Sequence, residues 1–516
     1  MKTDMTKGNP MKIILLFSIP VLMGNLFQQF YNMVDTIIVG QYLGSKALAA
    51  VGSTGCIMFL VLGFANGIAQ GFGVMASHAF GAKKEKLLKH YVALAIILTV
   101  IVSVVLTIPT VLASRQLLIW LNTPDDILVM ADAYIKVIFA GIFCTMSYNV
   151  ASGLLRSIGD SKTPLYFLIF SSVLNIVLDI FFIVVVKAGT AGAAYATVIS
   201  QGIAAVLSFI VMFKKYDLLR TSREDYYMDW SGIWRMLSIG LQMALNYSIT
   251  AIGTMIFQAA VNVFGSQVVA AYTAASKVNN IATQTMPTLG TAAATYCGQN
   301  LGAGRYDRIF KGMKSCFFIC IGCAVLAAAI NCFVGPYMIG WFITSPTATD
   351  IDYAMKYLKI ASVFMLPLAW IFAYRNGLQG LNKGLVPMLS GVMELVSRLI
   401  AILALSKPFG YGGVCFADPA AWLTTGILLI VTYYVGAAHE EEGTVKPQMR
   451  FSVDKTSWGC EQQGISGRNR RKSGWYMSHK RCTSWLSPCE SAQALSFCAL
   501  APNRAQAFFV CGYPSA

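Results

Sequence analysis

Carboxyl, amide and hydroxyl side chains recur at helical spacing inside two long apolar stretches of the chain. The first stretch carries four polar residues spaced three, four and three positions apart: Asn25, Gln28, Asn32 and Asp35. The second carries three at a spacing of four: Ser171, Asn175 and Asp179. Residues three or four positions apart lie on the same face of a helix. Each set therefore predicts a polar stripe along one helix.

These side chains offer only oxygen and amide groups, which suit a hard cation such as Na⁺ or a proton shared between carboxylates. An ionised carboxylate in apolar surroundings costs free energy, so Asp35 and Asp179 each require a partner. The alternative is that the polar groups form hydrogen bonds that only lock neighbouring helices together. For an isolated Asn or Thr we favour that alternative. Where two acids and two neutral oxygen-bearing side chains lie at the same depth in neighbouring helices, we favour a cation site.

Composition indicates that the helices cross a membrane. Of the 516 residues, 56% are hydrophobic and only 12% are charged, whereas soluble proteins carry roughly 25% charged residues. A span needs roughly 17 to 25 apolar residues. Twelve runs qualify: 11–38, 48–75, 91–113, 130–152, 164–186, 190–213, 233–260, 266–296, 315–341, 353–374, 385–406 and 413–436. The predicted fold class is an all-α polytopic membrane protein with twelve transmembrane helices.

The distribution of Lys and Arg predicts the orientation, because cytoplasmic loops are enriched in these residues. With the N-terminus inside, the inner segments hold twenty basic residues, Arg156 and Arg375 among them. The outer loops hold four, namely Lys46, Arg115, Lys187 and Lys407. Both termini are therefore predicted to be cytoplasmic. The net charge of +16 then reflects membrane topology, and no nucleic-acid partner is expected.

Topology and counting also predict depth. Asp35 lies five residues before Gly40, Asp179 lies eight before Lys187, and Thr197 lies five after Gly192. At about 1.5 Å per residue, all three are expected roughly 8–12 Å below the outer boundary. Asn175 lies one turn deeper than Asp179. Two carboxylates, an amide and a hydroxyl from three runs are thus expected at nearly one level.

The chain contains an internal repeat. The segment "LGSKALAAVGSTG" from Leu43 pairs with "FGSQVVAAYTAAS" from Phe264, and "HAFGAKK" from His78 pairs with "QNLGAGR" from Gln299. Both pairs are offset by 221 residues. Each copy holds six runs, and an even number returns the chain to the same side, so the copies are parallel and related by an axis along the membrane normal.

We therefore predict an N-terminal six-helix lobe over residues 1–227, a C-terminal six-helix lobe over 228–450 and a charged linker over 214–230. Residues 451–516 show neither span-length hydrophobicity nor helical periodicity. They are interpreted either as a disordered extension or as an out-of-frame or cloning-derived sequence.

About residues 10–440 resemble the multidrug and toxic compound extrusion (MATE) family of transporters. The resemblance rests on the order of these segments: "SIPVLMGNLFQQFYNMVDTIIVGQYLG", "HAFGAKK", "GLLRSIGDSKTP", "NIVLDIFFI", "GTAGAAYATVISQ", "AAATYCGQNLGAGR" and "VPMLSGVMELVSR". It implies two pseudo-symmetric lobes in a V around a central cavity. It also implies export of organic, often cationic, compounds in exchange for Na⁺ or H⁺ by alternating access.

The resemblance further implies the ligands of the coupling cation. Asp35, Asn175, Asp179 and Thr197 match the positions that hold it in family members with a site in the N-terminal lobe. Other members place acids in spans seven and ten, but the seventh run has none here, so a site in the C-terminal lobe is not expected.

Seven further residues are predicted to contact substrate in the cavity: Gln28, Tyr31, Asn32, Asn246, Gln258, Glu394 and Arg398. Glu394 and Arg398 are four residues apart and can pair on one helix face. They are either a structural ion pair or a substrate contact.

Other function classes are less consistent with the sequence. The Gly-x4-Gly-Lys-Ser/Thr motif of ATP-driven transport does not occur, and only four His are present, scattered along the chain. Neither an enzyme nor a bound cofactor is expected. A flippase for lipid-linked oligosaccharide is the alternative, although it would require more cationic groups in the spans. We expect a monomer in the bacterial plasma membrane.

Overall fold

The computed structural model describes residues 4–121, 123–342 and 347–441, and all regular secondary structure in these ranges is helical. The first copy of the repeat contains α1 (Pro10–Leu43), α2 (Ser45–Ser53), α3 (Gly55–Gly81), α4 (Glu85–Trp120), α5 (Asp125–Ala140), α6 (Ile142–Ser157), α7 (Lys162–Ile180), the π-helical turn η1 (Phe181–Val185) and α8 (Gly189–Lys215). The predicted tail, 451–516, lies outside the described residues.

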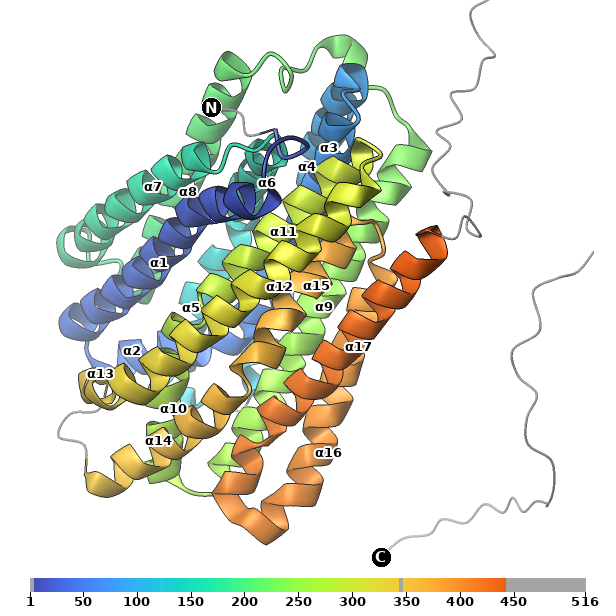
Figure 1. The fold of residues 1–516 in the computed structure, drawn as a ribbon. Helices are drawn as coiled ribbons and strands as arrows, with labels where there is room; N and C mark the ends of the chain where they lie inside the picture. The colour runs from blue at the N-terminus through green and yellow to red at the C-terminus, as the bar shows by residue number, and fades with distance from the viewer. Residues whose placement is uncertain (1–3, 122, 343–346, 442–516) are drawn as a thin grey trace, which may run out of the picture. The chain divides into compact units, whose positions relative to one another are not determined.

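The second copy follows a 3₁₀ turn, η2 (Arg223–Asp225), in the linker. It contains α9 (Trp230–Asn262), α10 (Ser266–Ala282), α11 (Thr285–Gly302), α12 (Tyr306–Ala329), the π-helical turn η3 (Ile330–Val334), α13 (Gly335–Phe342), α14 (Ala348–Val363), α15 (Met365–Gly380), α16 (Leu385–Cys415) and α17 (Ala417–Glu441). Figure 1 shows α1, α7 and α8 side by side, with α16 and α17 on the other side of the bundle.

Among the described residues, eight helices are long and apolar enough to cross a membrane, or ten if each of two bent pairs is one span. The predicted runs 266–296 and 413–436 fall on α10–α11 and on α17, outside these ten. The chain is an all-α polytopic membrane protein of the predicted class.

The two bent pairs occupy corresponding positions in the two copies. The α5–α6 pair bends by 46° and the α14–α15 pair by 56°. Gly141 separates the first pair, and a Cβ there would lie 2.2 Å from a Val198 methyl group. Phe364 separates the second pair, and Pro367, just beyond, has no N–H with which to continue the helix.

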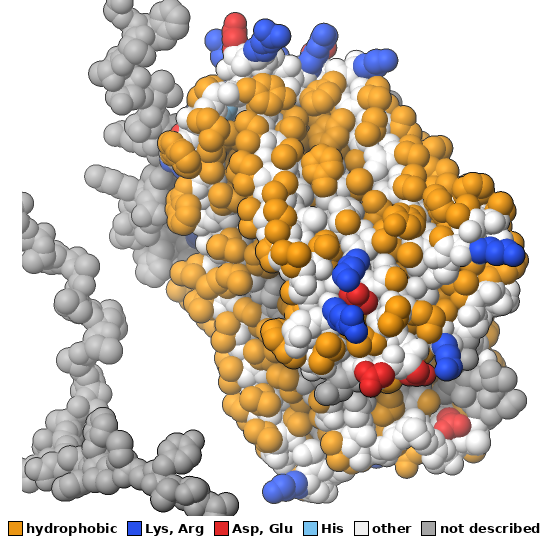
Figure 2. Space-filling view, turned by 180° about the vertical axis from the view of Figure 1, so that it is seen from behind, with side chains coloured by type: hydrophobic (Ala, Val, Ile, Leu, Met, Phe, Trp, Pro, Cys, Tyr) orange, Lys and Arg blue, Asp and Glu red, His pale blue; other side chains and the backbone are white. Residues whose placement is uncertain are grey.

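Hydrophobic side chains cover much of the surface of the bundle. Figure 2 shows them spread over this face, with a row of Lys and Arg along its upper edge and a few charged side chains elsewhere. Leu112 is 80% exposed and Phe333 is 76% exposed. Such a continuous apolar surface is suited to lipid rather than to water.

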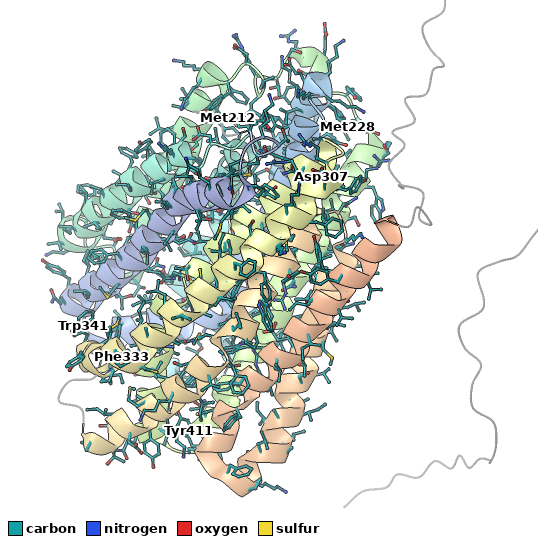
Figure 3. The ribbon with its side chains drawn as sticks, viewed as in Figure 1. Met212, Met228, Asp307, Phe333, Trp341 and Tyr411 are labelled. Carbon is teal, nitrogen blue, oxygen red and sulfur yellow. The ribbon has the colours of Figure 1, made fainter. Side chains whose placement is uncertain are left out.

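Loops gather at two opposite ends of the bundle. In Figure 3, Met228 of the linker and Asp307, which follows the α11–α12 turn, lie at one end, whereas Phe333, Trp341 and Tyr411 lie at the other. We call the first end the linker face. It holds the turns at residues 82–84, 158–161, 216–229, 303–305 and 381–384.

Helices of the two copies meet closely next to the linker face. A Cβ on Gly71 of α3 would lie 2.4 Å from the Gly240 Cα of α9, and a Cβ on Gly67 would lie 2.4 Å from the Ala244 backbone nitrogen. Small residues let helix backbones approach in membranes, where packing replaces the hydrophobic effect as the force between helices. The close contact between α3 and α9, which we call the seam, thus depends on small residues such as Gly67 and Gly71.

The segment Asp4–Asn9 precedes α1 but is bound by the second copy. Arg308 of α12 donates hydrogen bonds to the carbonyls of Met5 at 3.1 Å and Gly8 at 2.9 Å. The Met5 N–H donates to Gln299 Oε1 of α11 at 3.0 Å, and the Met5 side chain is fully buried. The start of the chain therefore ties the two copies together at the linker face.

Asp160, in the turn between α6 and α7, links α7 to the end of α8. Its Oδ1 accepts from the Thr163 N–H at 3.0 Å, and its Oδ2 accepts from the Thr163 hydroxyl at 2.6 Å and from the Tyr216 hydroxyl. Lys215 Nζ lies 3.6 Å from Oδ2. Burial alone would raise the pKa of Asp160, but these hydrogen bonds and the Lys215 charge outweigh it and hold the pKa below its usual value.

We predict that Gly71→Ala lowers the stability of the protein, whereas Gly322→Ala does not. Both changes gain the same helix propensity, but only at Gly71 does the new methyl group meet backbone atoms; a Cβ at Gly322 meets nothing within 4 Å. Overpacking of this kind costs about 1–3 kcal/mol. Thermal unfolding in detergent measures the difference. Equal midpoints for the two variants would contradict the close approach of α3 to α9.

We also predict a pH-dependent loss of stability in Asp160→Asn. Because the folded-state pKa is depressed, the carboxylate stabilises the fold above the ordinary Asp pKa of about 4. This contribution disappears as pH falls through the lower folded value. The variant should lose about 1–2 kcal/mol of unfolding free energy at pH 7, with a smaller deficit near pH 3. Thermal unfolding at both pH values tests this, with Asp126→Asn, an exposed site, as control. If Asp160→Asn loses as much unfolding free energy near pH 3 as at pH 7, the carboxylate of Asp160 does not have the depressed pKa assigned to it.

Candidate functional site

Three neighbouring helices bring the predicted cation ligands together. Asp35 lies on α1, Asn175 and Asp179 lie on α7, and Thr197 lies on α8. Helix α7 packs against both α1 and α8. Asn175 and Asp179 are fully buried, at 1% and 0% exposure, and Asp35 is partly buried.

The two carboxyl groups touch. Asp35 and Asp179 form a side-chain hydrogen bond with each other. A carboxylate oxygen only accepts, so this bond requires a proton on one of the pair. Two adjacent ionised carboxylates repel each other, so the pair favours a shared proton or a bound cation between α1 and α7.

Asn175 connects this pair to α8. In one orientation of its amide, the nitrogen donates to the Thr197 hydroxyl at 3.3 Å. In the other, the nitrogen donates to Asp179 Oδ2 and the oxygen accepts from the Thr197 N–H, both at 3.3 Å. In the second orientation the amide bridges Asp179 and Thr197, so that the four predicted ligands form one cluster.

The cluster fits a small hard cation. Asp35 Oδ1 and Asp179 Oδ1 are buried and have no hydrogen-bond partner. Buried carboxylate oxygens without partners are costly, and a cation or a second proton would satisfy them. No group of three or more His, Cys, Asp or Glu side chains suited to a metal ion occurs in the described ranges. The donor set favours Na⁺ or H⁺ over a transition metal.

A cavity of about 580 Å³ lies beside the cluster. Asn175 and Thr197 form part of its wall. Tyr31 lines it too and forms hydrogen bonds with Gln28 and Gln201, and it lies within the electrostatic reach of both carboxyl groups. Tyr31 thus stands between the carboxyl pair and the cavity. The predicted cavity residues Gln28, Tyr31 and Asn32 all line this wall.

Cross-copy hydrogen bonds close the linker-face side of this cavity. His78 Nε2 of α3 donates to the Gly380 carbonyl of α15 at 2.7 Å. Gln299 Nε2 of α11 donates to the Ser157 carbonyl of α6 at 2.7 Å. His78 and Gln299 are equivalent in the repeat, so a matched pair of contacts joins the two copies near the linker face.

The structure places the other four predicted cavity residues elsewhere. Asn246 donates to the Pro387 carbonyl at 2.8 Å, and Gln258 donates to Asn262 at 2.9 Å. Neither lines the 580 Å³ cavity, nor do Glu394 and Arg398. The geometry therefore does not support their assignment to this cavity.

Glu394 and Arg398 belong to a buried chain of charges in the second copy. Glu394 pairs with Arg375 at 2.7 Å and with Arg398 at 3.2 Å, and Arg398 pairs with Asp418 at 2.8 Å. The network joins α15, α16 and α17. Arg375 was predicted to be a loop charge. It lies inside α15 instead, with its side chain 12% exposed, because Glu394 of α16 neutralises its charge.

Several cavity residues were missed from the sequence. Gln201 follows Thr197 by four residues, so helical spacing alone would have placed it on the same face. Asn149 donates to Asn66 across α6 and α3 at 2.7 Å, and no pattern within either helix indicates that pair. Arg156, counted as a loop charge, lines the cavity instead.

Comparison with known proteins agrees with this architecture. The pattern that defines the MatE family matches residues 20–181 and 242–409. The chain is 31% identical over 410 residues to "Probable multidrug resistance protein YpnP" of Bacillus subtilis, covering 79% of this chain and 89% of that protein. It is 31% identical to "Probable multidrug resistance protein YoeA" of the same species, covering 59% and 67%.

Among solved structures, the fold matches one described as the outward-facing conformation of a multidrug resistance MATE family transporter. The TM-score is 0.79 at 23% identity, covering 86% of this chain and 99% of that one. Taken with the family match over both copies, this shows that the chain belongs to the MatE family, the transporter family that its sequence resembles.

Proposed function

We propose that the protein is a secondary active antiporter that exports organic compounds in exchange for Na⁺ or H⁺ by alternating access. The observation that carries this proposal is the contact between Asp35 and Asp179 beside a large cavity. The names of the relatives, which describe multidrug resistance proteins, support the export of organic compounds.

Lys and Arg bias assigns the linker face to the cytoplasm, with both termini on that side of a bacterial plasma membrane. The contacts of His78 and Gln299 would then close the cavity toward the cytoplasm. On this orientation the structure represents the state that releases substrate outward and receives the coupling cation.

Coupling follows from the position of Tyr31. It lies on α1 four residues before Asp35, one turn away, and faces the cavity. A cation held by Asp35 and Asp179 draws α1 toward α7 and alters the hydrogen bonds of Tyr31 with Gln28 and Gln201. An ion that binds two conformational states equally cannot shift the equilibrium between them. The ion can therefore drive transport only if it binds one state more tightly than the other.

The cavity suits loosely specific organic cargo. Its volume lies within the roughly 300–1,000 Å³ typical of drug-sized ligands. Amides and aromatic rings share the wall, including Asn66, Tyr148 and Tyr247. Among the described residues that line it, Arg156 is the one cationic side chain, which makes the pyrophosphate of a lipid-linked oligosaccharide a poorer match. The observations therefore favour the antiporter over the flippase.

We predict that Asp35→Asn and Asp179→Asn each reduce gradient-driven efflux at least about tenfold, since each removes a charge that must bind the coupling ion. Everted vesicles with a Na⁺ gradient or a pH gradient imposed separately measure efflux and identify the ion. Asp126→Asn, an exposed substitution in the same copy, controls for changes in net charge.

Folding is checked by gel filtration and by the thermal midpoint of each variant in detergent. Wild-type efflux in either folded variant would refute the coupling role of that carboxyl group.

A further inference from the structure

Arg156 is a charged residue of the cavity wall that the proposed coupling mechanism does not use. It lies on α6, one residue before the end of the helix, and it lines the 580 Å³ cavity. Its side chain is partly buried and, within the described part of the chain, forms neither a hydrogen bond nor an ion pair. A guanidinium carries five N–H donors. Those of Arg156 therefore face the cavity without a partner in the protein.

The wall of the cavity supplies no counter-charge to this guanidinium. Among the described residues that line the cavity there is no Asp or Glu. The titratable groups within electrostatic reach of Arg156 are Tyr148 and Tyr247, which are phenols and not carboxyl groups. A cation inside a membrane-spanning bundle costs free energy unless an opposite charge meets it, which makes such a residue a candidate for a functional site. Arg156 therefore requires an anion that the described residues do not provide.

Other arginines inside the bundle are satisfied by the protein itself. Arg375 and Arg398 both pair with Glu394, at 2.7 Å and 3.2 Å. Arg308 donates to the backbone carbonyls of the N-terminal segment. Where a guanidinium serves the fold, the chain thus places acceptors around it. The contrast indicates that Arg156 is available to a ligand.

Small residues leave room for a ligand beside Arg156. Ser152 and Gly153 precede it on α6 by four and three residues, so they share its helix face. Gly73 of α3 lies opposite, because a Cβ there would be 3.3 Å from the Gly153 carbonyl oxygen. All three small residues line the cavity. Larger side chains at these positions would fill the space in which an anionic group can meet the guanidinium.

Two aromatic rings near Arg156 suit the organic part of a ligand. The Tyr247 hydroxyl accepts a hydrogen bond from Gln70 Nε2 at 2.8 Å, and the Tyr148 hydroxyl donates to the Pro164 carbonyl at 3.1 Å. These bonds hold both rings in place, and both rings line the cavity. Aromatic side chains provide large apolar contact surfaces for flat rings. The wall around Arg156 therefore combines one cation with aromatic surface.

From this combination we infer that the exported compound is an organic carboxylate, whose carboxylate pairs with Arg156 while its aromatic or apolar part lies against Tyr148 and Tyr247. A guanidinium binds a carboxylate through two parallel N–H···O bonds. One cation matches one negative charge, so a monocarboxylate fits better than a phosphate dianion. The inference rests on the proposed function in one respect, since it takes the 580 Å³ cavity as the site of the exported compound.

The position of Arg156 suits the capture of a compound from the cytoplasm. The next residue, Ser157, accepts the hydrogen bond from Gln299 that joins the two copies near the linker face. When that contact opens, Arg156 lies close to the opening and its charge attracts anions. Asp35 and Asp179 lie toward the opposite ends of their helices. The carboxylate of the compound and the coupling cation would therefore bind at opposite ends of the first copy.

The test is equilibrium binding of rhodamine B, which has a free carboxylate, and of its ethyl ester to the full-length protein in detergent, measured by fluorescence polarisation. The wild type should bind the acid at least about tenfold more tightly than the ester, as expected of charge-assisted hydrogen bonds. Arg156→Gln should lose this preference. Arg156→Lys should keep part of it, because the charge remains but the paired contacts do not. Lys162→Gln, which removes equal charge from an exposed site next to the same turn, should keep all of it.

The measured quantity is the ratio of two affinities in one protein sample, so a fraction of unfolded protein weakens both signals without changing the ratio. Equal or tighter binding of the ester by the wild type would overturn the inference, as would a full preference for the acid in Arg156→Gln. If Arg156→Gln fails gel filtration, Arg156→Lys decides, because an undiminished preference there would also overturn it.

The binding test and the efflux test fail independently, because binding is measured without an ion gradient. A preference for the acid that persists while Asp35→Asn and Asp179→Asn show wild-type efflux would overturn the antiport and leave the role of Arg156 standing. Gradient-driven efflux that requires both carboxyl groups, combined with no preference for the acid, would overturn only the assignment of a carboxylate cargo.

Discussion

The contact between Asp35 and Asp179 constrains the rest of the first copy. Two unit charges 4 Å apart repel by about 4 kcal/mol at an effective dielectric constant of about 20, so two ionised carboxylates cannot rest together here without a positive charge. Helix α1 meets the consecutive helices α7 and α8 to hold them, and Asn175 joins α7 to α8 through Thr197. In the proposed mechanism, a change in the charge of the pair changes the attraction between α1 and α7, and Tyr31 carries that change to the cavity wall.

The second copy uses buried charge differently. Arg375, Glu394, Arg398 and Asp418 form a network in which each acid faces an arginine. Such a network is satisfied internally and gains nothing from an added ion, whereas removing one member would leave an uncompensated buried charge. The two copies share a fold and a repeat, yet one holds unpaired acid oxygens and the other holds a complete set of ion pairs. That asymmetry explains why the proposed coupling site lies in one copy only.

Sequence reasoning succeeds here where periodicity and topology suffice. Counting along the spans placed Asp35, Asn175, Asp179 and Thr197 at similar depth, and the structure brings them into one cluster. Sequence reasoning failed where a residue's contacts depend on how the helices are placed relative to one another. Arg375 and Asp418 lie near span ends, where a charge that pairs inside the bundle looks the same in sequence as one that reaches water. Asn246 and Gln258 share helical spacing with cavity residues but bond to their own copy, and only the arrangement of α9 against its neighbours reveals this.

The capture of the N-terminal segment by Arg308 and Gln299 has a consequence for biosynthesis. Residues Asp4–Asn9 are synthesised before the groups that bind them, which follow about three hundred residues later. Closing a loop of that length costs conformational entropy and delays the contact. The first helix must therefore enter the membrane with its leading segment still unbound, and that segment docks only after α11 and α12 have been inserted. The contacts of Asp4–Asn9 with α11 and α12 therefore form only after most of the helices have been made.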